Sequence, residues 1–357
     1  MSTPLAALLK TRIAAGGPMR LSDYMAECLL HPGHGYYTGA EPFGRGGDFI
    51  TAPEISQMFG ELLGLWLAQC WMDQGAPSRI TLAEAGPGRG TLMADILRAT
   101  RGVPGFHQAI AVHLIEASPR LRQVQREALR GWEVTWAESL QEVPEAPLYF
   151  VANEFFDALP VRQFTRAAEG WSETMVLLQD GALAPGRGAP RGVPALAHRL
   201  ADTNPGDVVE ICPAAAPLTG EIAGRIARHG GAALIIDYGN WRSRGDTVQA
   251  MKAHGYAGLF ETPGQADLTA HVDFEPLALA ARDAGLRPWG PLPQGDLLRA
   301  LGIEARAARL AQALSGEKLA SHLAATRRLT DAAEMGTLFQ ALALLPQTAP
   351  CPAGFIP

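Results

Sequence analysis

One short segment constrains the fold more than any other part of this sequence. Residues 80–83 predict a short buried strand, and the acidic Glu84 follows it. Three glycines then alternate with other residues: Gly86, Gly88 and Gly90. A helix is predicted from about residue 90 to residue 98. Because glycine has no Cβ, such a turn lets the backbone bend sharply and approach a ligand closely. The segment therefore predicts a ligand-binding turn at the carboxyl end of a strand.

Strands and helices alternate on the C-terminal side of this turn. Further strands are predicted at residues 109–115, 132–136, 148–152, 232–236 and 286–289. Ser118 is the predicted cap of a helix that runs to Arg130. Alternation of this kind predicts an α/β fold with a doubly wound, mostly parallel, Rossmann-like sheet.

The sequence suggests four segments. Residues 1–75 form a helical cap, with one helix capped by Ser22 and another from about Pro53 to Met72. Residues 76–157 are the first half of the core, and 158–229 an inserted subdomain with a β-hairpin. Residues 230–357 complete the core, with a long loop at 240–272 and a last strand at 335–344.

Composition narrows the class of protein. The 357 residues are 47% hydrophobic and 18% charged, which suits a chain with a substantial core. The net charge of −6 argues against nucleic acid as the partner. Four cysteines lie far apart, so neither a disulfide framework nor a cysteine zinc site is expected. No leader and no membrane-spanning run is recognised, so a soluble intracellular protein is the expectation.

Two cofactors compete for the glycine turn. A dinucleotide fingerprint, G-x-G-x-x-G, counted from Gly86 would need glycine at position 91, which is Thr91. The spacing instead resembles the E-x-G-x-G-x-G of class I methyltransferases, whose cofactor S-adenosyl-L-methionine carries a cationic amine and a sulfonium that suit Glu84. Glu116, after the second strand, would accept the ribose hydroxyls. The predicted cofactor-binding residues of this turn and the next strand are Glu84, Gly86, Pro87, Gly88, Gly90, Thr91 and Glu116.

The strand at 148–152 leads into a second group of polar residues. Asn153, Glu154 and Asp157 should point toward the transferred methyl group, although Asp157 could instead cap the next helix. Methyl transfer needs alignment more than acid catalysis. An arginine acceptor would need one or two carboxylates to grip its charged guanidinium, which suits Glu154 and Asp157. No histidine lies near them in sequence, so no metal is predicted.

At these residues the chain resembles the MidA-like class I methyltransferases, which include the mitochondrial complex I assembly methyltransferase and bacterial relatives. The matching segments are residues 31–37, 47–56, 59–61, 84–91, 153–161, 235–239 and 266–274. Ala85 departs from the bulkier apolar residue expected there. The resemblance implies S-adenosyl-L-methionine as cofactor, S-adenosylhomocysteine as product, and an arginine of a protein, for example a complex I subunit, as acceptor.

Several residues gain a role from this resemblance. Asp48 and Thr51, with Glu54, could close over the cofactor, or Thr51 and Glu54 could form a capping box. His271 could line the acceptor pocket, or its ring could bind a loop carbonyl. His34, in the N-terminal glycine-rich loop, could likewise be functional or structural.

The rival functions are methylation of a small molecule and a cofactor-binding assembly factor. A bacterial cytoplasmic location is expected, with the mitochondrial matrix for eukaryotic relatives. The oligomeric state stays open, and a dimer is compatible with the sequence.

Overall fold

The computed structural model of the protein describes residues 3–39 and 51–356. The chain divides into two compact units. The first, here called the sheet unit, comprises residues 50–156, 216–241 and 274–357. The second, the hairpin unit, comprises residues 1–49, 157–215 and 242–273.

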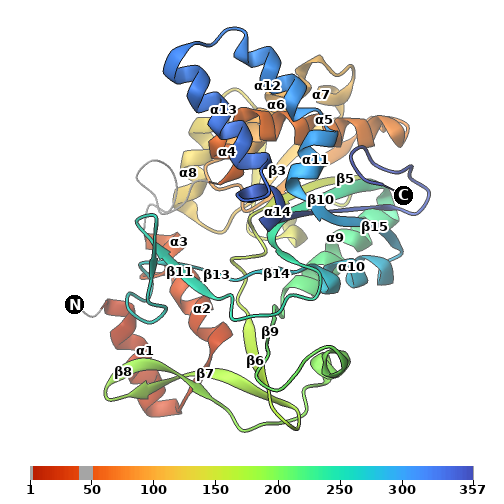
Figure 1. Ribbon diagram of the computed structural model, residues 1–357. Coiled ribbons are helices and arrows are strands. Elements are labelled where there is room, and N and C mark those ends of the chain that lie inside the picture. Colours follow the sequence, from red (N-terminus) through yellow and green to blue (C-terminus); the bar gives the residue numbers. More distant parts are fainter. Residues whose placement is uncertain (1–2, 40–50, 357) are drawn as a thin grey trace. The chain divides into compact units, whose positions relative to one another are not determined.

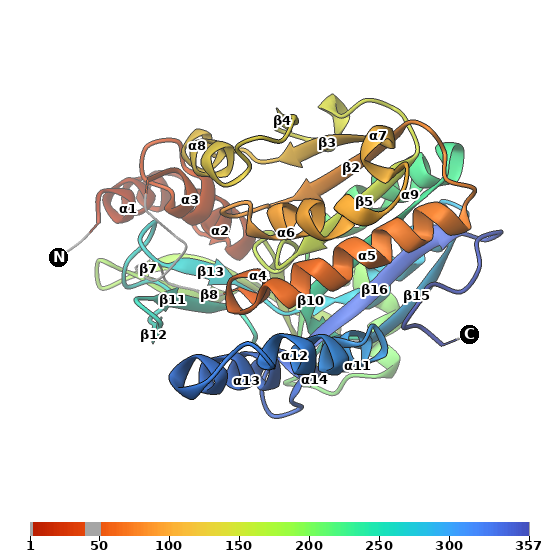
Figure 2. The same ribbon diagram turned by 90° about the horizontal axis from the view of Figure 1, so that it is seen from above.

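Seven strands of the sheet unit follow one another in the order β15-β16-β10-β5-β2-β3-β4, which can be followed in Figure 2 from the same sheet seen in Figure 1. Their bounds are β2 Ile80–Ala85, β3 Ile110–Ile115, β4 Val134–Ala137, β5 Leu148–Asn153, β10 Gly231–Asn240, β15 Leu286–Pro293 and β16 Phe339–Pro346. Neighbours from β10 to β4 pair in parallel, whereas β16 is antiparallel to both β10 and β15. The predicted α/β fold with a mostly parallel sheet is confirmed.

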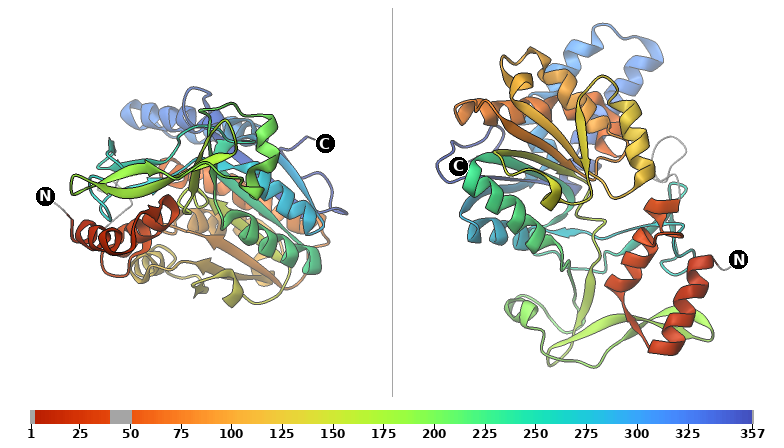
Figure 3. Two further views of the ribbon diagram at one scale, coloured as in Figure 1. Left: turned by 90° about the horizontal axis from the view of Figure 1, so that it is seen from below. Right: turned by 180° about the vertical axis from the view of Figure 1, so that it is seen from behind.

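The central strands are the most apolar, as expected where helices cover both faces of a sheet. Every residue of β2 and β5 is buried, and so is every residue of β10 before Asn240. Helices α5 and α6 lie on one face, while α9 and α10 lie on the other (Figures 1 and 3). Glu84 and Asn153 are polar residues at the ends of β2 and β5, and they therefore lie at the carboxyl edge of the sheet.

The helices of the sheet unit differ widely in length, from 4 residues in α4 to 17 in α5. Their bounds are α4 Ala52–Ile55, α5 Gln57–Asp73, α6 Thr91–Ala99, α7 Phe106–Ala109, α8 Pro119–Ala128, α9 Ala215–His229, α10 Phe274–Asp283, α11 Gln294–Ala300, α12 Ile303–Ala311, α13 Gly316–Thr330 and α14 Met335–Leu338. Short 3₁₀ turns cover Thr100–Gly102 and Leu140–Glu142. The predicted cap of α8 is confirmed, because Ser118 Oγ accepts a hydrogen bond from the Leu121 N–H at 3.4 Å.

Glycines allow α5 and α6 to pack closely, side by side over the strands (Figure 2). A Cβ on Gly60 would lie 2.6 Å from Asp95 Cβ, and one on Gly64 would lie 2.9 Å from Ile96 Cα. No real Cβ tolerates such distances, so glycine is required at both positions. The close packing fixes the first turn of α6, which follows the glycine loop.

The hairpin unit is built from short helices and two small sheets. Its helices are α1 Pro4–Gly16, α2 Leu21–Leu30, α3 Tyr36–Gly39 and the 3₁₀ helix Pro194–Ala201. One sheet contains β1 Met19–Arg20, β6 Arg162–Arg166, β7 Trp171–Gln179, β8 Ala182–Arg187 and β9 Val208–Ile211. The other contains β11 Gln249–Lys252, β12 Gly255–Ala257 and β13 Asp267–Thr269, and β14 spans Val272–Asp273. The unit has its own apolar core, centred on side chains of α1 and α2.

These units have other bounds than the four segments suggested by the sequence. The helix α5 packs on α6 and β10, so it belongs with the sheet and not with the first 39 residues. The helix α9 also belongs mostly with the sheet, and residues 242–273 belong to the hairpin unit. Within the described ranges, no helix is both long and apolar enough to cross a membrane.

Four local predictions are wrong. The helix expected from Pro53 to Met72 is two helices, because Ser56 is extended (φ −157°) and caps α5 by accepting from the Met58 N–H. The loop expected at 240–272 contains three short strands. Residues 335–338 are helical, so the last strand starts at Phe339. Ser22 lies inside α2, whose N-cap residue is Arg20.

Candidate functional site

The strand order reverses between β2 and β5. The chain passes from β2 to β3 and β4 on one side, then returns to β5 and β10 on the other. Ligands of open α/β sheets bind at such a switch point, outside the carboxyl ends of the strands. Ala85 pairs with Ala152 across these two strands, so the loops that begin at Gly86 and Glu154 leave the sheet side by side.

The glycine loop is shaped by three left-handed residues. Gly86, Gly88 and Gly90 have φ angles of 62°, 52° and 82°, a region that favours glycine. A Cβ on Gly86 would lie 2.7 Å from the Phe155 ring, so Gly86 packs against the neighbouring loop. A Cβ on Gly88 would meet no protein atom within 4 Å. Gly88 is therefore the point where the backbone can approach a ligand.

Two buried oxygen acceptors lie on one face of the sheet beside this loop. Glu84 Oε2 and Asn153 Oδ1 receive no hydrogen bond from the described residues, although both side chains are more than nine-tenths buried. Glu84 pairs with Val151, so the side chain of Asn153, two residues on, lies on the same face as Glu84. Burial raises the pKa of Glu84 to about 8, and the Met93 backbone N–H opposes this in part. Unpaired buried acceptors are costly, and a cation with N–H groups would satisfy them.

Glu116 is held firmly after β3. Its Oε1 accepts from the Ser118 N–H at 2.8 Å, and its Oε2 accepts from Gln125 Nε2 at 3.2 Å. Burial raises the pKa of Glu116, while these two hydrogen bonds oppose the rise. The carboxylate lies next to the glycine loop, because Gln125 also donates to the Gly88 carbonyl.

Glu154 has a strained backbone and one oxygen without a donor. Its φ of +51° is left-handed, which is uncommon for a residue other than glycine and typical of functional sites. Its Oε1 accepts from the Ala52 N–H at 2.9 Å and from Asn153 Nδ2 at 3.1 Å. No residue in the described ranges donates to Oε2. Burial raises the pKa of Glu154 to about 7, although Ala52, Asn153 and the charge of Arg328 lower it.

The short helix α4 connects this carboxylate to the glycine loop. Thr51 is its N-cap residue, but the Thr51 side chain makes no capping hydrogen bond, so the capping-box alternative is not formed. Glu54 instead accepts a hydrogen bond from the Thr91 hydroxyl. Since α4 contacts Glu154 at Ala52 and Thr91 at Glu54, it joins both loops. Asp48 lies outside the described residues.

The remaining predicted residues belong to the hairpin unit. Asp157 is buried, and its carbonyl accepts from the Ala270 N–H at 3.0 Å. The backbone N–H of His271 donates to Thr247 Oγ1, and burial lowers the pKa of the His271 ring. His34 stacks on His31, with ring centroids 5.2 Å apart. Asp157 and His271 are assigned to the hairpin unit, and Glu154 to the sheet unit.

Two important residues were missing from the predicted site. Asp237, inside the buried run of β10, is fully buried and accepts from the N–H groups of Phe155, Phe156 and Tyr238. It thereby fixes the turn that carries Glu154. Gln125 is also fully buried and joins the Gly88 carbonyl to Glu116. The sequence offered a signal for both: an acid directly after an apolar strand, and a glutamine on the apolar face of a helix.

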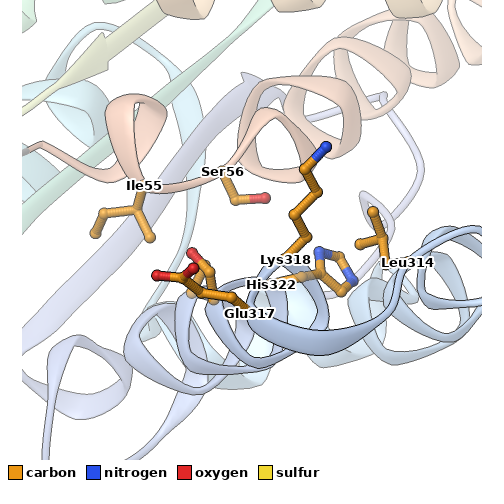
Figure 4. A pocket seen from close by; sticks show the side chains of 8 residues that line it. Ile55, Ser56, Leu314, Glu317, Lys318 and His322 are labelled. Carbon is orange, nitrogen blue, oxygen red and sulfur yellow. The ribbon is translucent and has the colours of Figure 1, made fainter.

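A separate pocket of about 480 Å³ lies between the α4–α5 joint and α13 (Figure 4). The labelled side chains that line it are Ile55, Ser56, Leu314, Glu317, Lys318 and His322. None of the predicted site residues is among the described residues that line it. Across the described parts of the chain, no group of three or more His, Cys, Asp or Glu side chains is arranged to hold a metal ion.

Comparisons with known proteins agree with this geometry. Residues 62–292 match the model of a family described as S-adenosyl-L-methionine-dependent methyltransferases. Protein arginine methyltransferase NDUFAF7 of Danio rerio is 38% identical, covering 94% of this chain and 86% of the relative, and that of Homo sapiens is 36% identical, covering 96% and 84%.

A solved structure from Burkholderia thailandensis is also similar over nearly the whole chain. It is described as a candidate methyl transferase bound to S-adenosyl-homocysteine. It is 32% identical, with a TM-score of 0.86, and the match covers 98% of this chain and 93% of that one. The chain therefore belongs to this family and is an S-adenosyl-L-methionine-dependent methyltransferase.

Proposed function

We propose that this methyltransferase transfers its methyl group to an arginine side chain of a protein. The observation that carries the proposal is Glu154, a carboxylate with a pKa of about 7 and an oxygen without a donor, at the carboxyl edge of the sheet. The names of the relatives, which are protein arginine methyltransferases, support the same acceptor.

The cofactor would lie along the glycine loop. Glu84 Oε2 and Asn153 Oδ1 are acceptors that fit its cationic amine, and Gly88 leaves room for close approach. Glu116 would accept the ribose hydroxyls, while Gly86, Pro87, Gly90 and Thr91 shape the loop. When bound, S-adenosyl-L-methionine supplies a methyl group on a sulfonium.

Side chains of this protein would align the acceptor arginine and receive the proton that its attacking nitrogen loses. Glu154 Oε2 would grip the guanidinium and concentrate its positive charge away from the attacking nitrogen. As the new C–N bond forms and the S–CH₃ bond breaks, the attacking nitrogen loses one proton. A carboxylate with a pKa near 7 is suited to receive that proton. Asp157 and His271 stay proposed as further catalytic residues.

Cofactor binding should release a proton from Glu84. With a pKa of about 8, the carboxyl is mostly protonated at about pH 7, and a neighbouring ammonium would favour the ionised form. We expect the release of nearly one proton per bound molecule, roughly 0.9 at pH 7. Titration calorimetry in two buffers with different ionisation enthalpies measures this number. Equal heats in both buffers for the wild type would contradict the prediction, and Glu84→Gln, which should bind more weakly without proton release, is the control.

The resemblance to the complex I assembly methyltransferases points to a more specific substrate. We propose a subunit of respiratory complex I as the protein substrate, and the bacterial cytoplasm as the place of the reaction. The relatives are named as mitochondrial proteins.

The test is transfer of labelled methyl groups from S-adenosyl-L-methionine to an extract of a strain that lacks this protein. Label in one protein band, recovered as methylarginine after hydrolysis, is the expected result. Label in small metabolites would overturn the arginine assignment. Binding of the cofactor without transfer to any component, even with purified complex I intermediates added, would overturn it in favour of an assembly factor.

A further inference from the structure

Gln125 lies on α8 with its side chain fully buried. Glutamine is seldom buried, and a buried amide needs partners for its donors and acceptor. Leu121 and Leu129, four residues before and after it, are also buried, so Gln125 occupies the apolar face of its helix. A hydrocarbon side chain would suit that face better if packing were its only purpose.

The partners of the amide come from three different elements. Nε2 donates to the Gly88 carbonyl at 2.9 Å and to Glu116 Oε2 at 3.2 Å. Oε1 accepts from Trp136 Nε1, on β4, at 2.8 Å. Rotating the amide by half a turn would place its oxygen against the Gly88 carbonyl and the Glu116 carboxylate, neither of which has a proton to donate. The three partners therefore allow only one orientation of the amide.

We propose that Gln125 is a positioning residue of the cofactor site, which holds the ribose-binding carboxylate of Glu116 at a fixed place relative to the Gly88 backbone. The inference rests on the cofactor placement proposed above. One amide thereby connects the loop after β2 with the residue after β3, and its position is fixed in turn by the Trp136 indole on β4.

The arrangement also keeps Glu116 ionised. Burial favours the protonated form of this carboxyl, and the hydrogen bond from Gln125 opposes it. Only an ionised carboxylate can accept from both ribose hydroxyls while still accepting from Ser118 and Gln125. Loss of the hydrogen bond from Gln125 would therefore make the Glu116 side chain more mobile and would also raise the pKa of Glu116.

The test combines Gln125→Met with S-adenosylhomocysteine and its 2′-deoxy and 3′-deoxy analogues. In the wild type each missing hydroxyl should weaken binding about tenfold, the usual effect of one hydrogen bond to a charged group. Gln125→Met should bind S-adenosylhomocysteine about tenfold more weakly and should discriminate far less against the analogues. Full discrimination in the variant, or unchanged affinity for S-adenosylhomocysteine, would overturn the proposal.

Two further variants separate this role from a purely structural one. Gln123→Met, at an exposed site on the same helix, should leave affinity and discrimination unchanged. Gln125→Glu keeps the size of the side chain but sets a second carboxyl beside Glu116. Its affinity relative to wild type should recover as pH falls from about 8 to about 6, because one shared proton restores the donor. The same relative affinity at both pH values would contradict the proposal, even if Gln125→Met fails to fold.

Glu116→Gln distinguishes failure of this inference from failure of the cofactor placement. If Glu116→Gln still discriminates fully against both analogues, Glu116 does not bind the ribose and the placement itself is wrong. If Glu116→Gln loses discrimination while Gln125→Met retains it, only the role of Gln125 is wrong.

Discussion

Glu154→Gln should bind S-adenosyl-L-methionine with unchanged affinity and lose methyl transfer, with kcat lower by roughly 100-fold or more. The variant is a sharp test because Oε1 makes both hydrogen bonds, to Ala52 and to Asn153. A glutamine can keep those two bonds and the left-handed backbone while it replaces only the free Oε2. The change therefore removes the negative charge that would grip the guanidinium, and cofactor titration together with single-turnover transfer measures its two effects separately.

Glu61→Gln is the matched control for this variant. Glu61 is a buried glutamate of the sheet unit, but its carboxylate pairs with Arg98 and Arg306 on α6 and α12. Loss of the charge on Glu61 should lower the melting temperature and leave kcat nearly unchanged. Full activity of Glu154→Gln would show that Glu154 only caps α4, and the acceptor assignment would be lost.

The pH dependence of kcat/KM follows from the raised pKa of Glu154. The ionised carboxylate is the active form, and its pKa is about 7 before the acceptor binds. Activity on an arginine peptide should therefore fall about tenfold from about pH 8 to about pH 6, since protonation removes the charge. The residual activity of Glu154→Gln should lack this acidic limb. A wild-type profile that is flat over this range would contradict the role of Glu154 as a carboxylate.

The sheet could be predicted because its strands carry a strong local signal. Residues 80–83, 148–152 and 232–236 are mostly apolar runs bounded by polar, proline or glycine residues, and each forms part of a buried central strand. The three strands between residues 249 and 269 could not be found in this way. They are three or four residues long, and the turn between β11 and β12 uses Ala253 and His254, both left-handed, where glycine or asparagine would have been the recognisable signal.

The loops of the candidate site could be predicted, but their connections could not. A strand that ends in Glu84 or Asn153 points to the carboxyl edge, and the topology brings both loops together. Nothing local in the sequence pairs Glu154 with Ala52, or Gln125 with Gly88, because these residues meet only through the packing of α4 and α8. Sequence patterns therefore predicted which residues carry the candidate chemistry. Which residues hold them in position depends on tertiary contacts that the sequence patterns do not show.

Gly88→Val should abolish measurable cofactor binding, with an affinity loss of about 100-fold or more. Gly88 has a φ of +52°, and a Cβ there would meet no protein atom within 4 Å, so a side chain would project into open space, along the path proposed for the cofactor, and not into the core. The left-handed backbone adds a cost of about 1–2 kcal/mol for a residue with a Cβ. Calorimetric titration with S-adenosylhomocysteine, together with the melting temperature of the free protein, separates the lost affinity from the lost stability.

Gly131→Val is the control, because it also places a side chain on a glycine with positive φ, away from the loop. Gly131 has a φ of +93°, and a Cβ there would also meet no protein atom within 4 Å. Both valine variants should therefore lose stability, while only Gly88→Val should lose the cofactor. If both variants bind S-adenosylhomocysteine equally well, the ligand does not approach Gly88, and the proposed path of the cofactor along this loop is wrong. If Gly88→Ala binds better than Gly88→Val at equal stability, the size of the side chain, and not the strained backbone, excludes the ligand.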